Sequence, residues 1–458
     1  MKQNPIYSEN TPQVQKLADI CRADSNITPQ DYFEYGVKRG LRDNNGKGVL
    51  TGLTEVSSII GTAEMDGRLI PRDGILRYRG YDIFDLVDGF IKEKRFGFEE
   101  VAWLLMFGRL PDEVELREFG EMIGSYRVLP TNFVRDVVMK APSSDMMNAL
   151  ARCVLTSASY DTNPDDTSIP NVVRQCTQLI AKLPMFAVYG YQAYSHYIEG
   201  NSLYIHTPDP KLSTAENILM MLRPDMKYTD LEAKVLDLCL VLHAEHGGGN
   251  NSSFTMRVVT SSGTDTYSAV AASLASLKGP RHGGANRKVV QMMDTMKKEV
   301  KDWRDDDEIA NYLVGMLEGE RFDKKGLIYG MGHAVYSISD PRAVILKKFA
   351  KALSNEKNLE DEFDLYLRVE QIAPEVISRN RKMYKGVCAN VDFYSGFVYE
   401  MLGLPLECYT PMFAVSRMAG WSAHRLEELV QNGKIIRPAY RGVCPDRKYI
   451  PIGERFAE

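Results

Sequence analysis

The 458-residue sequence has few cysteines, no apolar run of transmembrane length and no excess of basic residues. Its seven cysteines contain no C-x-x-C pair and follow no regular spacing. This favours reduced thiols in a cytoplasm over a secreted disulfide scaffold. The net charge of -5 argues against a nucleic acid as the main partner, and the polar N-terminus MKQNPIYSENTPQVQ offers no signal peptide. The sequence therefore predicts a cytoplasmic protein without nucleic-acid or membrane partners.

Several catalytic motifs are also missing. There is no G-x-x-x-x-G-K-[ST] loop for nucleotide phosphates and no G-x-S-x-G nucleophile elbow. The segment GMGHAV lacks the third glycine of a dinucleotide-binding fingerprint and stands in a helical context. The sequence thus indicates neither a nucleotide cofactor nor a serine hydrolase.

Hydrophobic periodicity predicts a mainly α-helical fold with a small N-terminal β region. Between residues 49 and 80, β-branched residues alternate with glycine and Asp-Gly pairs, which is typical of short strands and hairpins. After Tyr81 the pattern becomes helical. The predicted helices include 145–157, 170–197, 214–223, 229–246, 284–300, 306–319, 340–355, 358–379 and 411–431.

A change in composition suggests how the chain divides. The highly charged stretches KKEVKDWRDDDE, EGERFDKK and SNEKNLEDEFD all fall between residues 283 and 390. We predict an N-terminal extension (1–48), a large helical domain (49–282 and 393–458) and a small helical domain (283–392). The boundaries lie near two glycine-rich motifs, where a hinge beside a cleft is expected.

Histidines are scarce, and most of them stand in unusual surroundings. Four of the seven lie in segments dense in glycine and polar residues. These segments are VLHAEHGGGNNSSFTMR (His243 and His246), LKGPRHGGANRKV (His282) and GLIYGMGHAVYSISDPRA (His333). Glycines beside a histidine let the backbone approach a ligand and direct its amides at it. Three such motifs favour a ligand-binding or catalytic site over isolated structural histidines.

An acid and two arginines extend this pattern. In GVCANVDFYSGFVYEMLGLP, Asp392 lies between apolar residues, so it is either a general base or belongs to a helix start at which Asp392 or Asn390 is the N-cap. Arg417, on the apolar helical segment TPMFAVSRMAGWSAHRLEEL, needs an anionic ligand or a structural ion pair. Arg342 begins a predicted helix nine residues after His333, and Arg437 precedes a proline in GKIIRPAYRG.

Together these motifs resemble those of the citrate synthase family, in the family's order and spacing. The segments that carry the resemblance are HAEHGGGNNSSF, LKGPRHGGAN, GMGHAVYSISDPRA, NVDFYSGFVYEMLG, TPMFAVSRMAGW and IIRPAYRG, within residues 50–445. The resemblance implies a helical homodimer that uses acetyl-CoA and oxaloacetate, with the active site in the cleft between the two domains.

The resemblance also implies residue roles. Asp392 would remove a proton from the acetyl-CoA methyl group, His282 would stabilise the enol, and His333 would donate a proton to the ketone of oxaloacetate. His246, Arg342 and Arg417 would bind oxaloacetate, and Arg437 would reach in from the partner subunit. CoA would contact Leu327, Gly330, Gly332 and Lys385. No metal and no cofactor beyond the CoA substrate is implied.

Three positions depart from the family pattern. Gly247 stands where many relatives carry Glu, Arg281 where many carry Leu, and Ser337 where some carry a basic residue that contacts CoA. The proposed acid–base residues are unaffected, but these departures leave open which acyl-CoA is preferred and how CoA is held.

Three alternatives remain open at this stage. A 2-methylcitrate synthase would use propionyl-CoA with the same residues, because one methyl group is worth only about 1–3 kcal/mol of discrimination. A helical metal-binding protein would use His243, Glu245, His246, His282 and His333 as ligands. A non-catalytic protein that has kept the fold is the third.

Overall fold

The computed structural model describes residues 8–23, 27–43, 48–280, 282–380 and 386–455. The chain divides into two compact units, and the division falls between Leu53 and Thr54. The first unit contains α1 (Pro12–Ala23), α2 (Pro29–Glu34) and the short 3-10 helix η2 (Arg39–Leu41).

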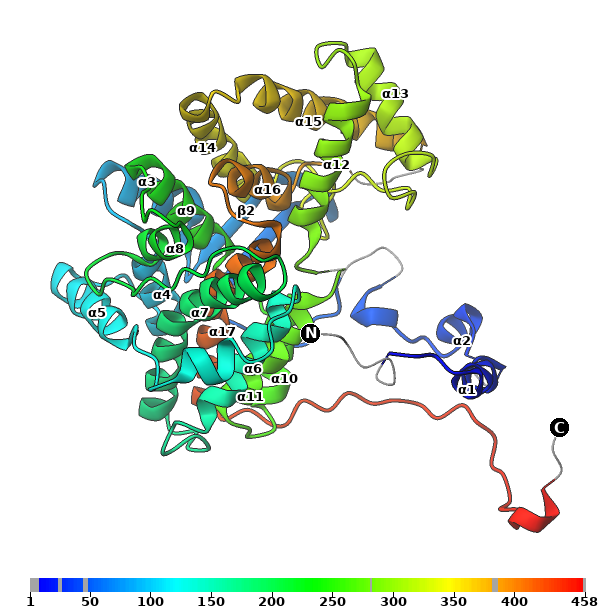
Figure 1. Cartoon of the computed structure of the whole chain (residues 1–458). Helices are drawn as coiled ribbons and strands as arrows, with labels where there is room; N and C mark the ends of the chain where they lie inside the picture. Colours follow the sequence, from blue (N-terminus) through cyan, green and yellow to red (C-terminus); the bar gives the residue numbers. More distant parts are fainter. Residues whose placement is uncertain (1–7, 24–26, 44–47, 281, 381–385, 456–458) are drawn as a thin grey trace. The chain divides into compact units, whose positions relative to one another are not determined.

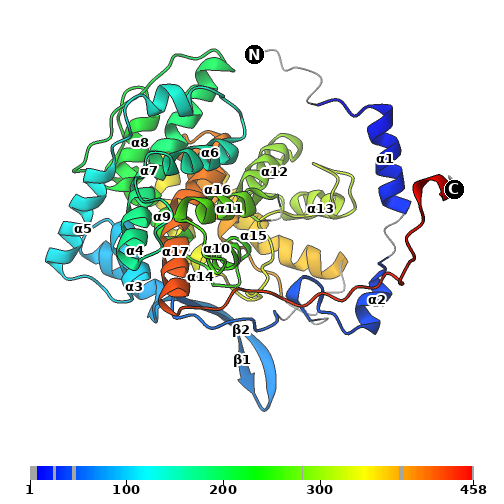
Figure 2. The same ribbon diagram turned by 90° about the horizontal axis from the view of Figure 1, so that it is seen from below.

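The second unit begins with a three-stranded antiparallel sheet in the order β1-β2-β3. Its strands are β1 (Ser57–Met65), β2 (Arg68–Tyr78) and β3 (Tyr81–Asp82). Asp66 and Gly67 join β1 to β2 with φ of 51° and 72°, as a two-residue hairpin turn of the favoured twist requires. Figure 2 shows this hairpin projecting from the helices. The predicted β region is confirmed, although its strands begin at Ser57 and not at residue 49.

The regular secondary structure in the described rest of the second unit is helical, so the predicted mainly α-helical fold class is confirmed. The helices before the glycine-rich LKGPRHGGAN segment are α3 (Ile83–Lys92), α4 (Phe98–Phe107), α5 (Glu113–Tyr126), the π-helix η3 (Val134–Val138), α6 (Met146–Ala158), α7 (Ile169–Tyr197), α8 (Thr214–Leu222), α9 (Asp230–His243), α10 (Asn251–Thr260) and α11 (Thr266–Lys278). After it come α12 (Ala285–Glu299), α13 (Asp306–Leu317), α14 (Pro341–Lys357), α15 (Glu360–Asn380), α16 (Val391–Met401), η4 (Leu406–Cys408), α17 (Tyr409–Val430) and η5 (Ile452–Glu454).

Helix α17 lies in the interior and packs against α4, α7, α9, α10 and α11. Its residues are buried from Tyr409 almost without interruption to Glu427, as expected of a helix without a solvent-facing stripe. Gly420 allows the closest approach, because a Cβ there would lie 2.4 Å from the carbonyl oxygen of Ala244. The end of α9 is therefore held directly against the middle of α17.

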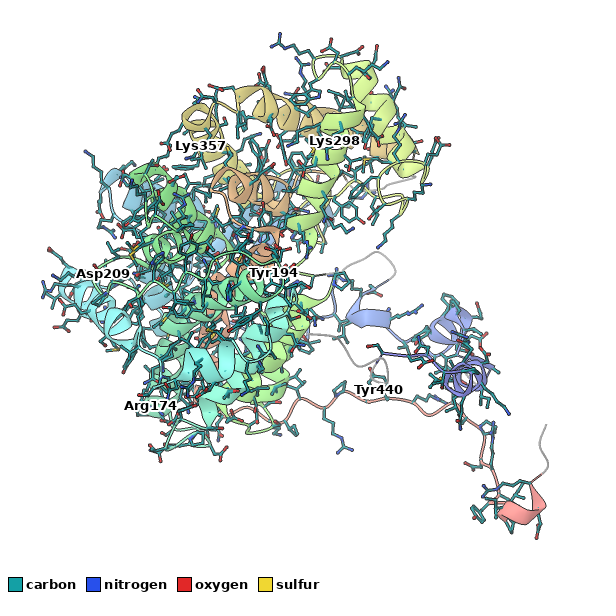
Figure 3. The ribbon with its side chains drawn as sticks, in the orientation of Figure 1. Arg174, Tyr194, Asp209, Lys298, Lys357 and Tyr440 are labelled. Atoms are coloured by element: carbon teal, nitrogen blue, oxygen red, sulfur yellow. The ribbon has the colours of Figure 1, made fainter. Side chains whose placement is uncertain are left out.

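Helices α12 to α16 form a second group, in which α16 packs against α12 and α14, and α15 packs against α13 and α14. Figure 1 shows these five helices together, and Figure 3 labels Lys298 on α12 and Lys357 on α14. Helix α14 also contacts α9, α3 and β2. This group therefore meets the rest of the unit along α9 and at α3, α17 and the sheet.

Between α17 and the last described residue, at position 455, the chain has no regular secondary structure apart from η5. Tyr440 in this segment is 94% exposed (Figure 3). Among the described residues, no helix is both long enough and apolar enough to cross a membrane.

Candidate active site

The predicted site residues lie mostly at helix ends, where backbone groups are left free to face a ligand. His246 follows α9, His282 precedes α12, His333 lies in the loop before α14, and Arg342 and Asp392 lie in the first turns of α14 and α16. Arg417 is the exception and lies within α17.

The rings of His246 and His333 lie edge to face, with centroids 5.0 Å apart. Tyr336 stacks on His333 at a centroid distance of 4.7 Å. His333 Nδ1 accepts hydrogen bonds from the backbone N–H groups of Val335 and Tyr336, both at 3.1 Å. Because Nδ1 is an acceptor, the proton of the neutral ring resides on Nε2. His333 is thus arranged to donate a hydrogen bond from Nε2.

His246 is buried, and its Nε2 has no hydrogen-bond partner in the described part of the chain. Burial, followed by the nearby charge of Arg342, lowers its pKa well below the ordinary range. A neutral buried ring with an unused nitrogen costs free energy unless a ligand bonds to it. The position of His246 is therefore suited to binding a polar ligand.

His282 is held by Ser252 at the start of α10. The backbone N–H of Ser252 lies 3.3 Å from His282 Nε2, and the Ser252 hydroxyl lies 3.1 Å from the same atom. Trp421 Nε1 donates to that hydroxyl at 3.2 Å. Burial, aided by the charge of Arg417, lowers the pKa of His282 to about 4. Since Nε2 accepts from an amide, a neutral His282 carries its proton on Nδ1.

Asp392 lies in the first turn of α16, and the N-cap of that helix is Asn390, whose side chain accepts from the Asp392 backbone N–H. The cap interpretation therefore belongs to Asn390. Asp392 Oδ1 is buried and has no partner among the described residues. Burial raises the pKa of Asp392 to about 6, while Arg342 acts in the opposite direction. A carboxylate with this pKa is suited to removing a proton near neutral pH.

The two arginines differ in their contacts. Arg417 is fully buried, and its Nε donates to the His243 carbonyl at 2.7 Å, but both terminal nitrogens lack a partner in the described region. Burial lowers the pKa of Arg417 to about 10. Arg342, in contrast, forms a two-pronged ion pair with Asp340, at 3.0 and 2.7 Å. Of the two interpretations of Arg417, the contacts favour an anionic ligand, because its two terminal nitrogens have no partner in the described region, whereas two nitrogens of Arg342 are bonded to Asp340.

A buried polar network supports these residues, and the sequence reasoning did not predict it. Glu245 Oε1 accepts from His424 Nε2 at 3.0 Å and from the Ser57 hydroxyl at 2.9 Å. His424 Nδ1 in turn accepts from Arg257 at 2.9 Å. Burial alone would raise the pKa of Glu245, but His424 and Arg417 outweigh it and lower the pKa to about 2. The rare histidine at 424 and the acid in HAEH were the only sequence signals for this network.

This network also bears on the metal-binding alternative. Glu245 is hydrogen-bonded to His424, and the described residues contain no group of three or more His, Cys, Asp or Glu side chains arranged to hold a metal ion.

The same region accounts for one departure from the family pattern. Gly247 has φ of +89°, and a Cβ there would lie 2.6 Å from Ile59 Cδ1, so this backbone does not accommodate a Glu.

The residues predicted to contact CoA are less well defined. Gly330 and Gly332 have φ of 79° and 90°, in a loop where Met331 forms an antiparallel bridge with Ala389. Leu327 is 42% exposed at the start of this loop. Lys385, like Arg281, lies outside the described residues.

Arg437 is exposed in the segment that follows α17. Within the described ranges, no hydrogen bond or ion pair joins it to the other candidate residues. The predicted contribution of Arg437 to a partner subunit therefore stays a prediction.

Known proteins match this chain over most of its length. A family model for the citrate synthase C-terminal domain matches residues 44–439. A citrate synthase from Synechocystis is 34% identical over 413 residues, covering 89% of this chain and 92% of the relative. A 2-methylcitrate synthase from Corynebacterium glutamicum is 31% identical over 425 residues, covering 92% of this chain and 98% of the relative.

Solved structures agree. The citrate synthase of Thermoplasma acidophilum, in a ternary complex with carboxymethyl coenzyme A and oxaloacetate, is 28% identical with a TM-score of 0.74, covering 92% of this chain and 99% of that one. The citrate synthase of Pyrobaculum aerophilum is 30% identical with a TM-score of 0.72, covering 89% and 94%. The resemblance predicted from the motifs is thus confirmed, and the chain belongs to the citrate synthase family of enzymes.

Proposed function

We propose that this enzyme condenses acetyl-CoA with oxaloacetate and hydrolyses the resulting citryl thioester, releasing citrate and CoA. The observation that carries the proposal is the partly buried Asp392 carboxyl, whose Oδ1 is buried without a partner and whose pKa of about 6 suits a base, in a site that also contains the two unpartnered terminal nitrogens of Arg417. Removal of a proton from a carbon atom requires a base that is not already bonded to a partner. Binding of an anionic second substrate requires a cation with free donors.

In the first step, the Asp392 carboxylate takes a proton from the methyl group of acetyl-CoA. The electrons of the C–H bond form the enolate, and His282 stabilises it in its enol form by sharing the Nδ1 proton with the thioester oxygen. The low pKa of His282, about 4, keeps this ring neutral at physiological pH. A thioester α-proton is weakly acidic, so base and donor need to act together.

In the second step, the enol carbon attacks the ketone of oxaloacetate, and His333 Nε2–H protonates the developing alkoxide. Arg417 binds one carboxylate with its two terminal nitrogens, because a guanidinium fork matches a carboxylate in geometry and charge, and Arg342 binds the other while it keeps its ion pair with Asp340. His246 also binds oxaloacetate from the same chain, and Arg437 binds it from the partner subunit. Water then cleaves the citryl thioester.

We further propose the arrangement around this site. The large domain (49–282 and 393–458) and the small domain (283–392) enclose it, and closure of the cleft excludes water from the thioester before condensation. CoA lies along Leu327, Gly330 and Gly332, near Lys385. The enzyme acts as a cytoplasmic homodimer without a metal or a further cofactor.

The second candidate is a 2-methylcitrate synthase, favoured by the match to relatives of that name. It would use propionyl-CoA with the same residues, and the enzyme would then need space for one more methyl group beside Asp392 and His282. Such a difference is worth about 1–3 kcal/mol, or about 10- to 200-fold in kcat/KM.

The test is release of the CoA thiol from acetyl-CoA and then from propionyl-CoA, each with oxaloacetate. We expect the higher kcat/KM with acetyl-CoA, and loss of release in Asp392→Ala. The matched control is Asp364→Ala, which removes an exposed acid on α15. A higher kcat/KM with propionyl-CoA selects the second candidate. No release with either thioester from the folded protein overturns both and favours a non-catalytic role.

A further inference from the structure

The segments that lead into His333 and Asp392 are paired with each other. Met331 and Ala389 form an antiparallel bridge. On either side of it, the Gly332 N–H donates to the Cys388 carbonyl at 2.8 Å, and the Asn390 N–H donates to the Gly330 carbonyl at 2.9 Å. Residues 330–332 and 388–390 therefore form one short ladder, and a candidate acid–base residue follows each strand of that ladder.

The side chain of Asn390 joins the two ends of this ladder. Its Oδ1 accepts from the Asp392 backbone N–H at 3.0 Å, which caps α16. Its Nδ2 donates to the Gly332 carbonyl at 2.9 Å, immediately before His333. The reverse orientation of the amide would place its NH2 group against an N–H and its oxygen against a carbonyl, so both partners fix the orientation shown.

Only a carboxamide of this length makes both bonds. An Asp at this position would accept from the Asp392 N–H but has no donor for the Gly332 carbonyl. A Ser would also cap the helix, since serine is a favoured N-cap residue, but its shorter side chain does not span the distance to Gly332. The chemistry at position 390 is thus more specific than a helix cap requires.

Close packing keeps the ladder against the start of α16. Gly330 has φ of +79°, and a Cβ there would lie 2.8 Å from Phe393 Cδ2 and 3.0 Å from Phe393 Cα. Gly332 has φ of +90°. These positive φ angles favour glycine, and they let the loop before His333 lie directly on the first turn of the helix that carries Asp392.

We infer that Asn390 is a positioning residue that holds the proton acceptor Asp392 and the proton donor His333 at the spacing that carbon–carbon bond formation requires. The inference rests on the proposed function and extends it. Asn390 touches neither substrate: it acts through the α16 cap on one side and through Gly332 on the other. A change of about 1 Å between reacting groups costs on the order of 100-fold in rate.

The two hydrogen bonds of the Asn390 side chain affect different chemical steps. Enol formation uses Asp392 and His282, so it depends on the cap bond of Asn390. Condensation also uses His333, so it additionally depends on the bond to Gly332. Exchange of the acetyl-CoA methyl protons with deuterated water reports enol formation, because Asp392 takes a proton from the methyl group and returns a deuteron. Malate in place of oxaloacetate isolates this exchange, since it has no ketone for the enol to attack.

The experiment compares the full-length wild-type enzyme, Asn390→Ser and Asn390→Ala in methyl exchange and in CoA release with oxaloacetate. We expect Asn390→Ser to exchange within about threefold of the wild-type rate while its kcat for condensation falls by about 10- to 100-fold. Asn390→Ala loses both bonds, so both rates should fall. Circular dichroism and thermal unfolding establish that each variant is folded.

Two outcomes would overturn the inference. One is condensation by Asn390→Ser at the wild-type rate, which would make the bond to Gly332 irrelevant. The other is an equal loss of both rates in Asn390→Ser and Asn390→Ala, which would indicate a purely structural cap. Failure of the proposed function would differ from both, because the wild-type enzyme itself would then neither exchange methyl protons nor release CoA.

Discussion

Replacing Asp392 with Asn should abolish the activity of the enzyme and remove a loss of stability that grows as the pH rises. Asp392 has a pKa of about 6 in the folded protein, against an ordinary value of 3.8, because burial penalises its charged form. A folded-state pKa above the unfolded value means that ionisation of this carboxyl opposes folding. Asparagine has nearly the same shape and cannot ionise, so it removes this cost.

The size of the effect follows from the difference between the two pKa values, at about 1.36 kcal/mol per pH unit. The cost of the charge is absent below about pH 4, grows as the pH rises, and is nearly complete above about pH 6. Linkage gives a destabilisation of about 1.6 kcal/mol at pH 5 and at most about 3 kcal/mol at pH 8. Asp392→Asn should therefore gain about 1.4 kcal/mol on the wild type between these two pH values.

The assay is urea unfolding of both proteins from pH 5 to pH 8 at one fixed protein concentration, because the stability of the proposed dimer would depend on concentration. The pH-dependent part is the diagnostic quantity, since a new unpaired amide adds only a constant cost of about 1–3 kcal/mol. A difference between the two proteins that stays constant from pH 5 to pH 8 would refute the reasoning. Loss of CoA release in the same variant, by at least about 100-fold, is expected of a missing base.

Three further substitutions test other parts of the site. Arg417→Met should raise the KM for oxaloacetate by at least about 100-fold. It should leave the Tm equal or higher, because the buried guanidinium has two unpartnered nitrogens, and a large fall in Tm would contradict this reasoning. Glu245→Ala should lower the free energy of unfolding by about 3–5 kcal/mol, since it leaves the buried His424 Nε2 and the Ser57 hydroxyl without their acceptor, and a loss below about 1 kcal/mol in urea unfolding would show that the network contributes little. Gly74→Ala would place a Cβ 2.3 Å from the carbonyl oxygen of Ser339, in the loop between His333 and α14. It should lower the free energy of unfolding in urea by about 1–3 kcal/mol and reduce kcat. An unchanged kcat would mean that the sheet does not position this loop.

The sequence predicted the helices because they carry strong periodic patterns and clear end signals. The predicted helix 170–197 appears as α7 (Ile169–Tyr197), and the predicted helix 306–319 as α13 (Asp306–Leu317). The small β region was also predictable, because Asp66 and Gly67 form the kind of turn that an Asp-Gly pair favours. These features depend on residues near one another in the sequence, which is why a single sequence was sufficient.

The site was only partly predictable. The glycine-rich histidine motifs identified His246, His282 and His333, and the structure brings the first and third together. The sequence left open whether Asp392 is a general base or a helix N-cap, and whether Arg417 binds an anionic ligand or forms a structural ion pair. That choice depends on which neighbouring atoms are already bonded, and packing between distant segments decides it.

The supporting contacts were not predictable at all. The Ser252 amide that fixes the proton on His282, and the amide of Asn390 that reaches Gly332, bridge residues 30 and 58 positions apart in the chain. No periodicity or motif encodes such bonds, because they depend on side-chain orientation. The predicted contact of Lys385 with CoA is a different case, because Lys385 lies outside the described residues.

The unpartnered atoms of Arg417, His246 and Asp392 also have a consequence for the lifetime of the protein in a cell. Each is a buried polar group whose hydrogen-bonding capacity is unused within the described chain, so the empty enzyme is less stable than its ligand-bound form. A ligand at about 100 times its Kd adds about 2.7 kcal/mol to the free energy of unfolding, which lowers the unfolded population available to proteases about 100-fold. The abundance of this enzyme would then rise and fall with its substrate supply, without any change in its synthesis.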